Sequence, residues 1–470
     1  MNNPRLPVAA VLAAALTALN LPAAAADRAE SPAQTPTPVP APASPSAAAL
    51  IPSAPSPART SIPAAAPAGT PATSAYIAGL VAGALQIHPK TAAARARTLA
   101  ARQALDAIPL WEDPMISIGV MAAEKAMRRD DGDLAAGFEQ TLPRPGLYRA
   151  EKNRAAAEAG MQQAEEGVTA NELGLAIARL VIELALTDEL IRLQSDEVEQ
   201  VRILTGSALE RSKNPDATAV ESLRLESELA LLVQNLEATA RQRKQQAQAL
   251  NLVLLRPPGA GWPEFSLPGR ANVILSAATL RAEMERRNPK LLALRQAMEA
   301  AAAGTEAARQ QGKPIVSVGV DSNTWSGGDF RSAMFTLKVS LPWFNRKSYQ
   351  AETARRESLQ LAARRDLEAE LVEFSTQLSD LLTTVENHSR LAVSYQTEVI
   401  PRAGKSLEAL QNAWISSKAT LADVLDAQRL LLTARQSEKR ATAARLAAVQ
   451  QLTALSGAFA NSSITPPSRP

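Results

Sequence analysis

Two kinds of hydrophobic spacing occur along the chain, and each occurs twice. In the first kind, apolar residues recur in steps of four and three, which is typical of α-helices that pack as coiled coils. This spacing runs from Leu173 to Val201 and again from Leu367 to Val399. In the second kind, apolar and polar residues alternate, as they do over 316–320, and this predicts β-strands with one apolar face. The pattern therefore predicts long packed helices combined with a few short strands.

The order of these segments repeats at a spacing of about 200 residues. Three short motifs carry the repeat: His88-Pro89-Lys90 returns as Asn288-Pro289-Lys290, Ile116-Ser117-Ile118-Gly119-Val120 returns as Val316-Ser317-Val318-Gly319-Val320, and Thr141-Leu142-Pro143 returns as Ser340-Leu341-Pro342. Their order is the same in both halves and their offset is nearly constant. We therefore predict a tandem duplication with a first repeat over 76–253 and a second over 277–456.

Each repeat is predicted to follow one plan. A helix begins at the His-Pro or Asn-Pro step, because the first residue can cap the helix and proline is tolerated in its first turn. Two strands follow in each repeat, at Met115–Met121 and Phe138–Leu142 in the first and at Ile315–Asp321 and Met334–Leu341 in the second. A long helix then runs out, turns near 213–216 or 416–417, and a second helix returns. A helix over 147–211 would span on the order of 100 Å.

The segments outside the repeats have compositions of their own. Residues 1–26 are predicted to be a secretory signal peptide, with an uncleaved membrane anchor as the alternative. Residues 27–75 are predicted to be a disordered Pro/Ala-rich linker, because 12 of the 32 prolines lie within 31–73. An inter-repeat loop at 254–276 is expected to form a side domain with the chain end after Ser456, and 457–470 is expected to be a disordered tail.

Composition excludes several classes of function. The chain has no Cys, so a disulfide scaffold and a thiolate metal or redox site are excluded. A formal net charge of +3 without any basic block argues against nucleic-acid binding. No Gly-rich phosphate loop, nucleophile elbow or clustered acid–base pair is present, and only 2 His occur. We therefore expect no enzyme activity, no cofactor and no metal site.

Four short amphipathic strands next to very long helices leave two interpretations. If the apolar face meets lipid, the backbone groups must be satisfied in a closed barrel, and single-chain barrels begin at about eight strands. Four strands cannot close one, so this interpretation requires several copies that each donate four strands. In the soluble alternative, the strands form a small sheet that covers the helix ends. Export without a hydrophobic helical span favours the barrel.

The ordered set of motifs resembles the TolC-like outer membrane efflux proteins. The resemblance covers about 76–456 and is carried by the tandem organisation, Asn288-Pro289, Leu142-Pro143, Leu341-Pro342-Trp343-Phe344-Asn345 and Asp423-Val424-Leu425-Asp426-Ala427-Gln428. It implies a mainly α fold in which tandem coiled-coil helices form a periplasmic tunnel and four strands per chain join a trimeric 12-stranded outer-membrane β-barrel. It also implies a homotrimer in outer-membrane lipid that docks a periplasmic adaptor attached to an inner-membrane efflux pump.

The same resemblance assigns candidate gate residues. Asp423 and Asp426 match the inward-facing aspartates of the family, and Trp414 matches an aromatic residue before the turn. Where some members carry a gate arginine, this chain has Ala419 with Lys418 adjacent, so a gate salt bridge at that position is in doubt. Three copies of an aspartate around a narrow axis would favour cations. The alternative is that Asp423 and Asp426 are solvated charges near a helix N-terminus.

The function implied is a passive export duct in the outer membrane, part of a tripartite efflux or type I secretion-like system, opened by the adaptor and driven by the pump. The alternative is a periplasmic coiled-coil scaffold that conducts nothing.

Overall fold

The computed structural model describes residues 69–120, 134–212, 220–269, 277–324, 330–416 and 418–462. The helices are α2 (Ser74–Ile87), α3 (Pro89–Asp106), α4 (Pro145–Ser212), α5 (Val220–Val253), α6 (Ala277–Arg287), α7 (Pro289–Gln311), α8 (Arg346–Ser394), α9 (Ile400–Ile415), α10 (Leu421–Leu455) and α11 (Ala458–Ser462). The strands are β1 (Thr70–Pro71), β2 (Met115–Val120), β3 (Leu134–Thr141), β4 (Phe265–Ser266), β5 (Val316–Thr324) and β6 (Phe330–Val339).

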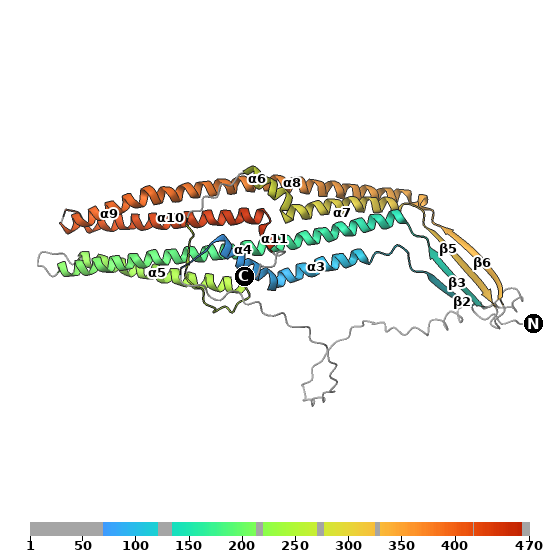
Figure 1. The fold of residues 1–470 in the computed structure, drawn as a ribbon, viewed down its shortest axis with the longest axis horizontal. Helices are drawn as coiled ribbons and strands as arrows, with labels where there is room; N and C mark the ends of the chain where they lie inside the picture. The colour runs from blue at the N-terminus through green and yellow to red at the C-terminus, as the bar shows by residue number, and fades with distance from the viewer. Residues whose placement is uncertain are drawn as a thin grey trace, which may run out of the picture. The chain divides into compact units, whose positions relative to one another are not determined.

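The two predicted repeats have the same order of elements. In the first, α3, β2 and β3 precede the helical pair α4 and α5; in the second, α7, β5 and β6 precede α8, α9 and α10 (Figure 1). The helices α4 and α5 pack together as one hairpin, and α9 packs on α10 as the other. Across the repeats α4 packs against α7 and α10, so the halves share their packing surfaces.

Side-chain caps explain where the first helix of each repeat begins. His88 Nδ1 accepts a hydrogen bond from Lys90 N at 3.1 Å, and Asn288 Oδ1 accepts one from Leu291 N at 3.1 Å. Pro89 and Pro289 occupy the first turn, where a missing N–H costs nothing. The predicted helix starts at the His-Pro and Asn-Pro steps are confirmed.

The four longer strands form one antiparallel sheet in the order β2-β3-β5-β6. The central pairing of β3 with β5 joins the two repeats, with Phe138 opposite Val320. The sheet lies beyond the helix ends at which β3 leads into α4 and β6 leads, through the 3₁₀ turn η1 (Pro342–Asn345), into α8 (Figure 1).

The predicted strands are present, but three of them are longer than the alternation indicated. β3 begins at Leu134, β5 extends to Thr324 and β6 begins at Phe330, all beyond the predicted bounds of these strands. These added residues are mostly small or polar, so they carry little hydrophobic pattern. Backbone pairing, such as Leu134 with Thr324, extends the strands because it depends little on the side chain.

The outward helix of the second repeat is interrupted, which the continuous 4-3 spacing did not indicate. A π-helical turn, η2 (Tyr395–Val399), separates α8 from α9, and Ile400 N donates to Tyr395 O. Pro401 follows directly. Proline has no N–H and its ring crowds the carbonyl four residues earlier, so a wider turn at this point relieves the helix.

The inter-repeat segment packs beside the helices together with the end of the chain. β4 pairs in parallel with β1, and Phe265 and Phe459 are buried in a cluster with Leu254, Ile177 and other apolar residues. The linker and tail boundaries therefore need correction: β1 pairs with β4, α2 begins at Ser74, and Phe459 of α11 and Ala72 are both buried in this cluster. Their few apolar residues were too short a run to predict burial.

Several predicted features lie outside the described residues. These are the signal peptide at 1–26, most of the linker at 27–75, the turn at 213–216, and Ser417. In the described part of the chain, no helix combines the length and the apolar character needed to cross a membrane.

Candidate functional site

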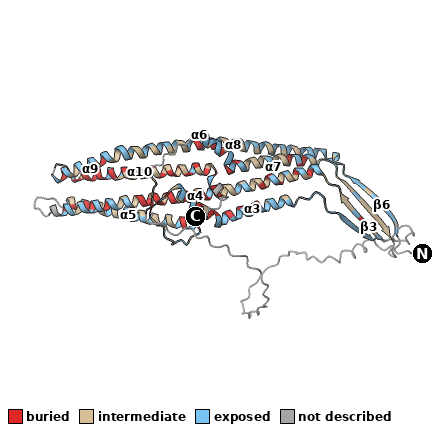
Figure 2. Ribbon diagram, viewed as in Figure 1, coloured by how far each residue is buried: buried red, intermediate tan, exposed pale blue. Residues whose placement is uncertain are grey.

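One face of the four-stranded sheet is apolar and open to the surroundings. Ile118 on β2 and Phe335 on β6 are 82% and 85% exposed. The same face carries further exposed apolar side chains, which are Ile116, Val120, Phe138, Val318, Leu337 and Val339. Among the described elements, the strands of this sheet make substantial contacts only with one another, and the ribbons of β3 and β6 are largely tan and pale blue in Figure 2. A surface of this kind is unusual in water and is typical of contact with lipid or another protein.

The opposite face of the sheet is polar and is organised by cross-strand contacts. Lys338 Nζ of β6 bonds Glu139 Oε2 of β3 at 2.5 Å, although β5 runs between them. Gly319 is the β5 residue opposite Glu139. Further along, Thr336 Oγ1 donates to Asp321 Oδ2 at 3.2 Å. Gly137 lies opposite Asp321, and a Cβ added there would lie 2.3 Å from the Asp321 carboxylate.

Both outer strands of the sheet have a free edge. β2 pairs only with β3 and β6 pairs only with β5 among the described residues. An open edge presents unpaired backbone N–H and C=O groups, which in lipid must find partners. Both edges are therefore open to further strands as far as the described residues go.

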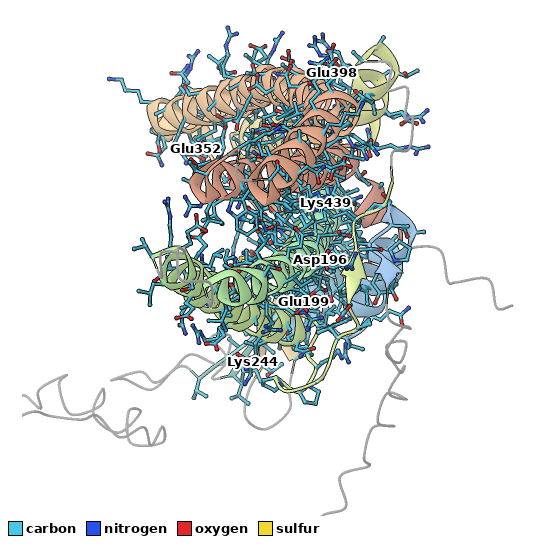
Figure 3. All side chains as sticks on the ribbon, turned by 90° about the vertical axis from the view of Figure 1, so that its left-hand side faces the viewer. Asp196, Glu199, Lys244, Glu352, Glu398 and Lys439 are labelled. Carbon is cyan, nitrogen blue, oxygen red and sulfur yellow. The ribbon has the colours of Figure 1, made fainter. Side chains whose placement is uncertain are left out.

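The second candidate site is the end of the helical hairpins, which we call the tip, where α9 ends and α10 begins. Figure 3 faces this end and shows the α4–α5 hairpin beneath the α9–α10 hairpin. Thr420 caps α10 in a capping box: Asp423 N donates to Thr420 Oγ1 at 3.3 Å, and Thr420 N donates to Asp423 Oδ2 at 3.0 Å. The Thr420 hydroxyl and N–H lower the pKa of Asp423 below its ordinary value. Asp423 is thus an ionised cap residue.

Asp426, one turn further along α10, points to solvent. Its side chain is 71% exposed, and its Oδ1 lies 3.5 Å from Arg429 Nη1. Arg429 makes a stronger contact with Glu228 of α5, with Nη2–Oε2 at 2.6 Å and Nε–Oε1 at 3.2 Å. Glu228 raises the pKa of Arg429 above its ordinary value. This bidentate pair links the two hairpins.

The other two candidate tip residues are placed differently from each other. Trp414 is 5% exposed and packs in a cluster with Leu407, Leu421 and Val424, so its position is structural. Lys418 is exposed, and its backbone N donates to Ala413 O at 2.8 Å in the turn. The structure therefore gathers Asp423, Asp426 and Lys418 at the tip surface, with Trp414 in the core beneath them.

Sequence reasoning missed Arg429 and Glu228, although a signal was available. The two residues are 201 positions apart, close to the repeat spacing, so they occupy nearly equivalent places in the two repeats. The Lys338–Glu139 pair is 199 positions apart and has the same relation. Comparing the duplicated halves for opposite charges at equivalent positions would have indicated both contacts.

Comparison with known proteins identifies the fold and one domain. Residues 280–458 match the model of the family described as outer membrane efflux protein. The outer membrane protein VceC from Vibrio cholerae is 18% identical with a TM-score of 0.69, covering 82% of this chain and 96% of VceC. The outer-membrane channel OprN is 17% identical with a TM-score of 0.68, covering 82% and 90%.

CusC, whose structures describe folding and transmembrane channel formation, is 17% identical with a TM-score of 0.68, covering 84% of this chain and 95% of CusC. No curated protein sequence matches the chain. The resemblance to TolC-like proteins is thus confirmed in fold over most of the chain and in sequence over the second repeat. Residues 280–458 are similar to the outer membrane efflux protein family, and the chain has the fold of the outer-membrane channels VceC, OprN and CusC.

Proposed function

We propose that three copies of this chain form an outer-membrane duct through which solute leaves the cell. Each copy would contribute the sheet β2-β3-β5-β6 to a closed barrel of about twelve strands. The paired helices would form a tunnel in the periplasm. In this proposal the duct is passive, and energy is supplied by a partner.

The observation that carries this proposal is the sheet with one exposed apolar face and two free edges. A four-stranded sheet cannot close on itself, whereas three of them can pair β6 of one copy with β2 of the next. The apolar face then meets lipid and the polar face, with Glu139, Asp321 and Lys338, lines the lumen. A soluble sheet that covers helix ends would bury its apolar face, and this one does not.

We assign the gate to the tip, where three copies of Asp426 would face a common axis with Asp423 beside them. Both carboxyl side chains are exposed, and the pKa of Asp423 is held below its ordinary value by Thr420, so a ring of these residues would attract cations. Asp423 has a structural task as well, because it completes the cap of α10. Lys418 would lie at the rim of the turn, where a periplasmic adaptor coupled to an inner-membrane pump docks.

The experiment measures assembly and conductance on the full-length protein. In mild detergent, light scattering after size exclusion is expected to give a trimer, and the protein is expected to fractionate with outer membranes. In planar bilayers, Asp423→Asn with Asp426→Asn is expected to lower cation preference, seen as a smaller reversal potential in a salt gradient. The matched control is Asp380→Asn on α8, which removes one carboxylate away from the tip.

Two outcomes would contradict the proposal. A monomer in mild detergent cannot close the barrel. Recovery as a soluble periplasmic protein would instead favour a coiled-coil scaffold that conducts nothing.

A further inference from the structure

The interface between the two hairpins contains buried polar groups inside an apolar cluster. The cluster draws on α4, α5, α9 and α10, through Val201, Leu225, Leu407, Val424, Leu425 and Leu431. Gln428 of α10 is only 2% exposed, and neither its side-chain nitrogen nor its oxygen makes a hydrogen bond of normal geometry among the described residues. A buried amide without hydrogen-bond partners lowers the stability of the fold, so the groups around Gln428 need an explanation.

The group that faces Gln428 is Glu197 of α4, which is 8% exposed. Burial raises the pKa of Glu197 to about 7; the nearby Glu228 also raises it, whereas the Gln428 amide and Arg435 lower it. No described cation lies within ion-pair distance of the Glu197 carboxyl, since Arg429 is engaged by Glu228 and Lys439 by Glu189 and Glu438. Glu197 is therefore a buried acid on which Arg435 acts from beyond ion-pair distance, and no described cation pairs with it directly.

We propose that the contact between the α4–α5 and α9–α10 hairpins is proton-sensitive and is held together when Glu197 is neutral. A neutral carboxyl can donate its proton to Gln428 Oε1 and so give the buried amide a partner. An ionised carboxylate places a second negative charge near Glu228 within the apolar cluster, which favours separation of the hairpins and entry of water.

The direction of the pH effect follows from the raised pKa. The stabilisation of the hairpin contact is complete below the ordinary glutamate pKa of 4.5 and is lost as the pH rises to about 7. Acid therefore closes the contact and neutral or basic conditions loosen it. For the duct, this inference rests on the proposed function and adds a regulation to it: acid outside the cell would keep the tip shut.

The test measures the contact itself in the full-length protein. The chain has no Cys, so Leu231→Cys on α5 and Leu430→Cys on α10 provide a unique pair of spin-label sites, 61% and 57% exposed. The distance between the labels is expected to lengthen as the pH rises from 5 to 8, with a midpoint near 7. Glu197→Gln is expected to remove this transition and hold the short distance throughout.

A matched control lies two residues away on the same helix. Glu199, labelled in Figure 3, is exposed and pairs with Arg202 at 2.9 Å, so Glu199→Gln removes the same charge outside the interface. It is expected to keep the wild-type transition. A Glu197→Gln protein that retains the transition, or a wild-type midpoint near 4.5, would overturn the proposal.

Conductance of the same variants in planar bilayers separates this inference from the channel function. If the distance between the labels changes with pH and no conductance is seen, the proton-sensitive contact is supported and the proposed duct is contradicted. If the protein conducts and neither the distance nor the open fraction depends on Glu197, the duct stands and the proton-sensitive contact fails.

Discussion

The sheet and the tip place the same kinds of side chain in opposite positions. In the sheet, Ile118 and Phe335 are 82% and 85% exposed. At the tip, Leu225 and Val424 are 0% exposed and lie between helices from both repeats. One region therefore presents its apolar atoms outward and the other buries them, within a single chain and without a change in composition.

This difference indicates that each region is adapted to its own surroundings, which are water for the tip and lipid or another copy for the sheet. Burying apolar area stabilises a fold by about 25 cal/mol per Å² only where the alternative is water. The tip gains this stabilisation inside one chain, whereas the sheet gains it only in lipid or beside another copy. Polar side chains are reversed in the same way: the Lys338–Glu139 pair lies on a face that would line a lumen, whereas Glu197 and Gln428 are buried in the packed interface.

The largest expected effect comes from placing a charge on the outward apolar face. Ile118→Lys is expected to prevent stable insertion, because a Lys near the middle of a lipid-facing strand costs about 2–4 kcal/mol and each trimer would carry three. The measurement is the fraction of trimer recovered in outer membranes. Ser117→Lys, the next residue on the same strand, is the control.

The control places the same lysine on the same strand but on the polar face of the sheet instead of the apolar face. Ser117 shares the polar face with Asp321, so a lysine there meets carboxylate and water and is expected to leave insertion unchanged. Equal loss of trimer in both variants would contradict a lipid-facing apolar surface. Loss in Ser117→Lys alone would mean that the assignment of the two faces is reversed.

The sequence predicted the strands and the helices well, because each kind of regular element gives its apolar residues a characteristic spacing. It predicted the helix starts because His88 and Asn288 combine a capping side chain with a following proline. The Arg429–Glu228 pair leaves no trace in the hydrophobic period, and only opposite charges at equivalent positions of the two repeats indicate it. The π-turn before Pro401 was missed for a related reason, because 4-3 spacing does not register one added residue in a turn.

An intermediate effect is expected from removing the link between the hairpins. Arg429→Ala leaves Glu228, whose side chain is 16% exposed, without its cation. Because the guanidinium is 53% exposed, the loss is about 1 kcal/mol, or roughly a fivefold higher open fraction. The measurement is single-channel open time at constant pH, and the spin-label distance should lengthen in parallel.

The exposed pair Arg390–Glu386 provides the comparison for this variant. It lies within one helix at 3.3 Å, so Arg390→Ala removes an arginine without separating any hairpins. Its open time is expected to match the wild type. Exchange of the two charges, as Arg429→Glu with Glu228→Arg, is expected to restore the link; an exchanged protein that stays open would show that the pair does not hold the hairpins together.

The smallest expected effect is local to the tip. Thr420→Ala removes the cap hydroxyl of α10, which costs about 0.5 kcal/mol of helix-end stability and raises amide exchange in the first turn roughly twofold. The pKa of Asp423 is lowered by Thr420, so the cap contributes above the ordinary aspartate pKa and weakens as the pH falls through the lowered value. The exchange difference between variant and wild type, measured by mass spectrometry, is therefore expected to be full at pH 7 and to shrink in strong acid.

The control is Thr383→Ala, which changes a mid-helix threonine whose hydroxyl donates to Ser379 O. It is expected to change amide exchange little. If the exchange difference between Thr420→Ala and the wild type is the same at pH 7 and in strong acid, the cap does not depend on the Asp423 carboxylate. Asp423 would then have a role only in the proposed gate.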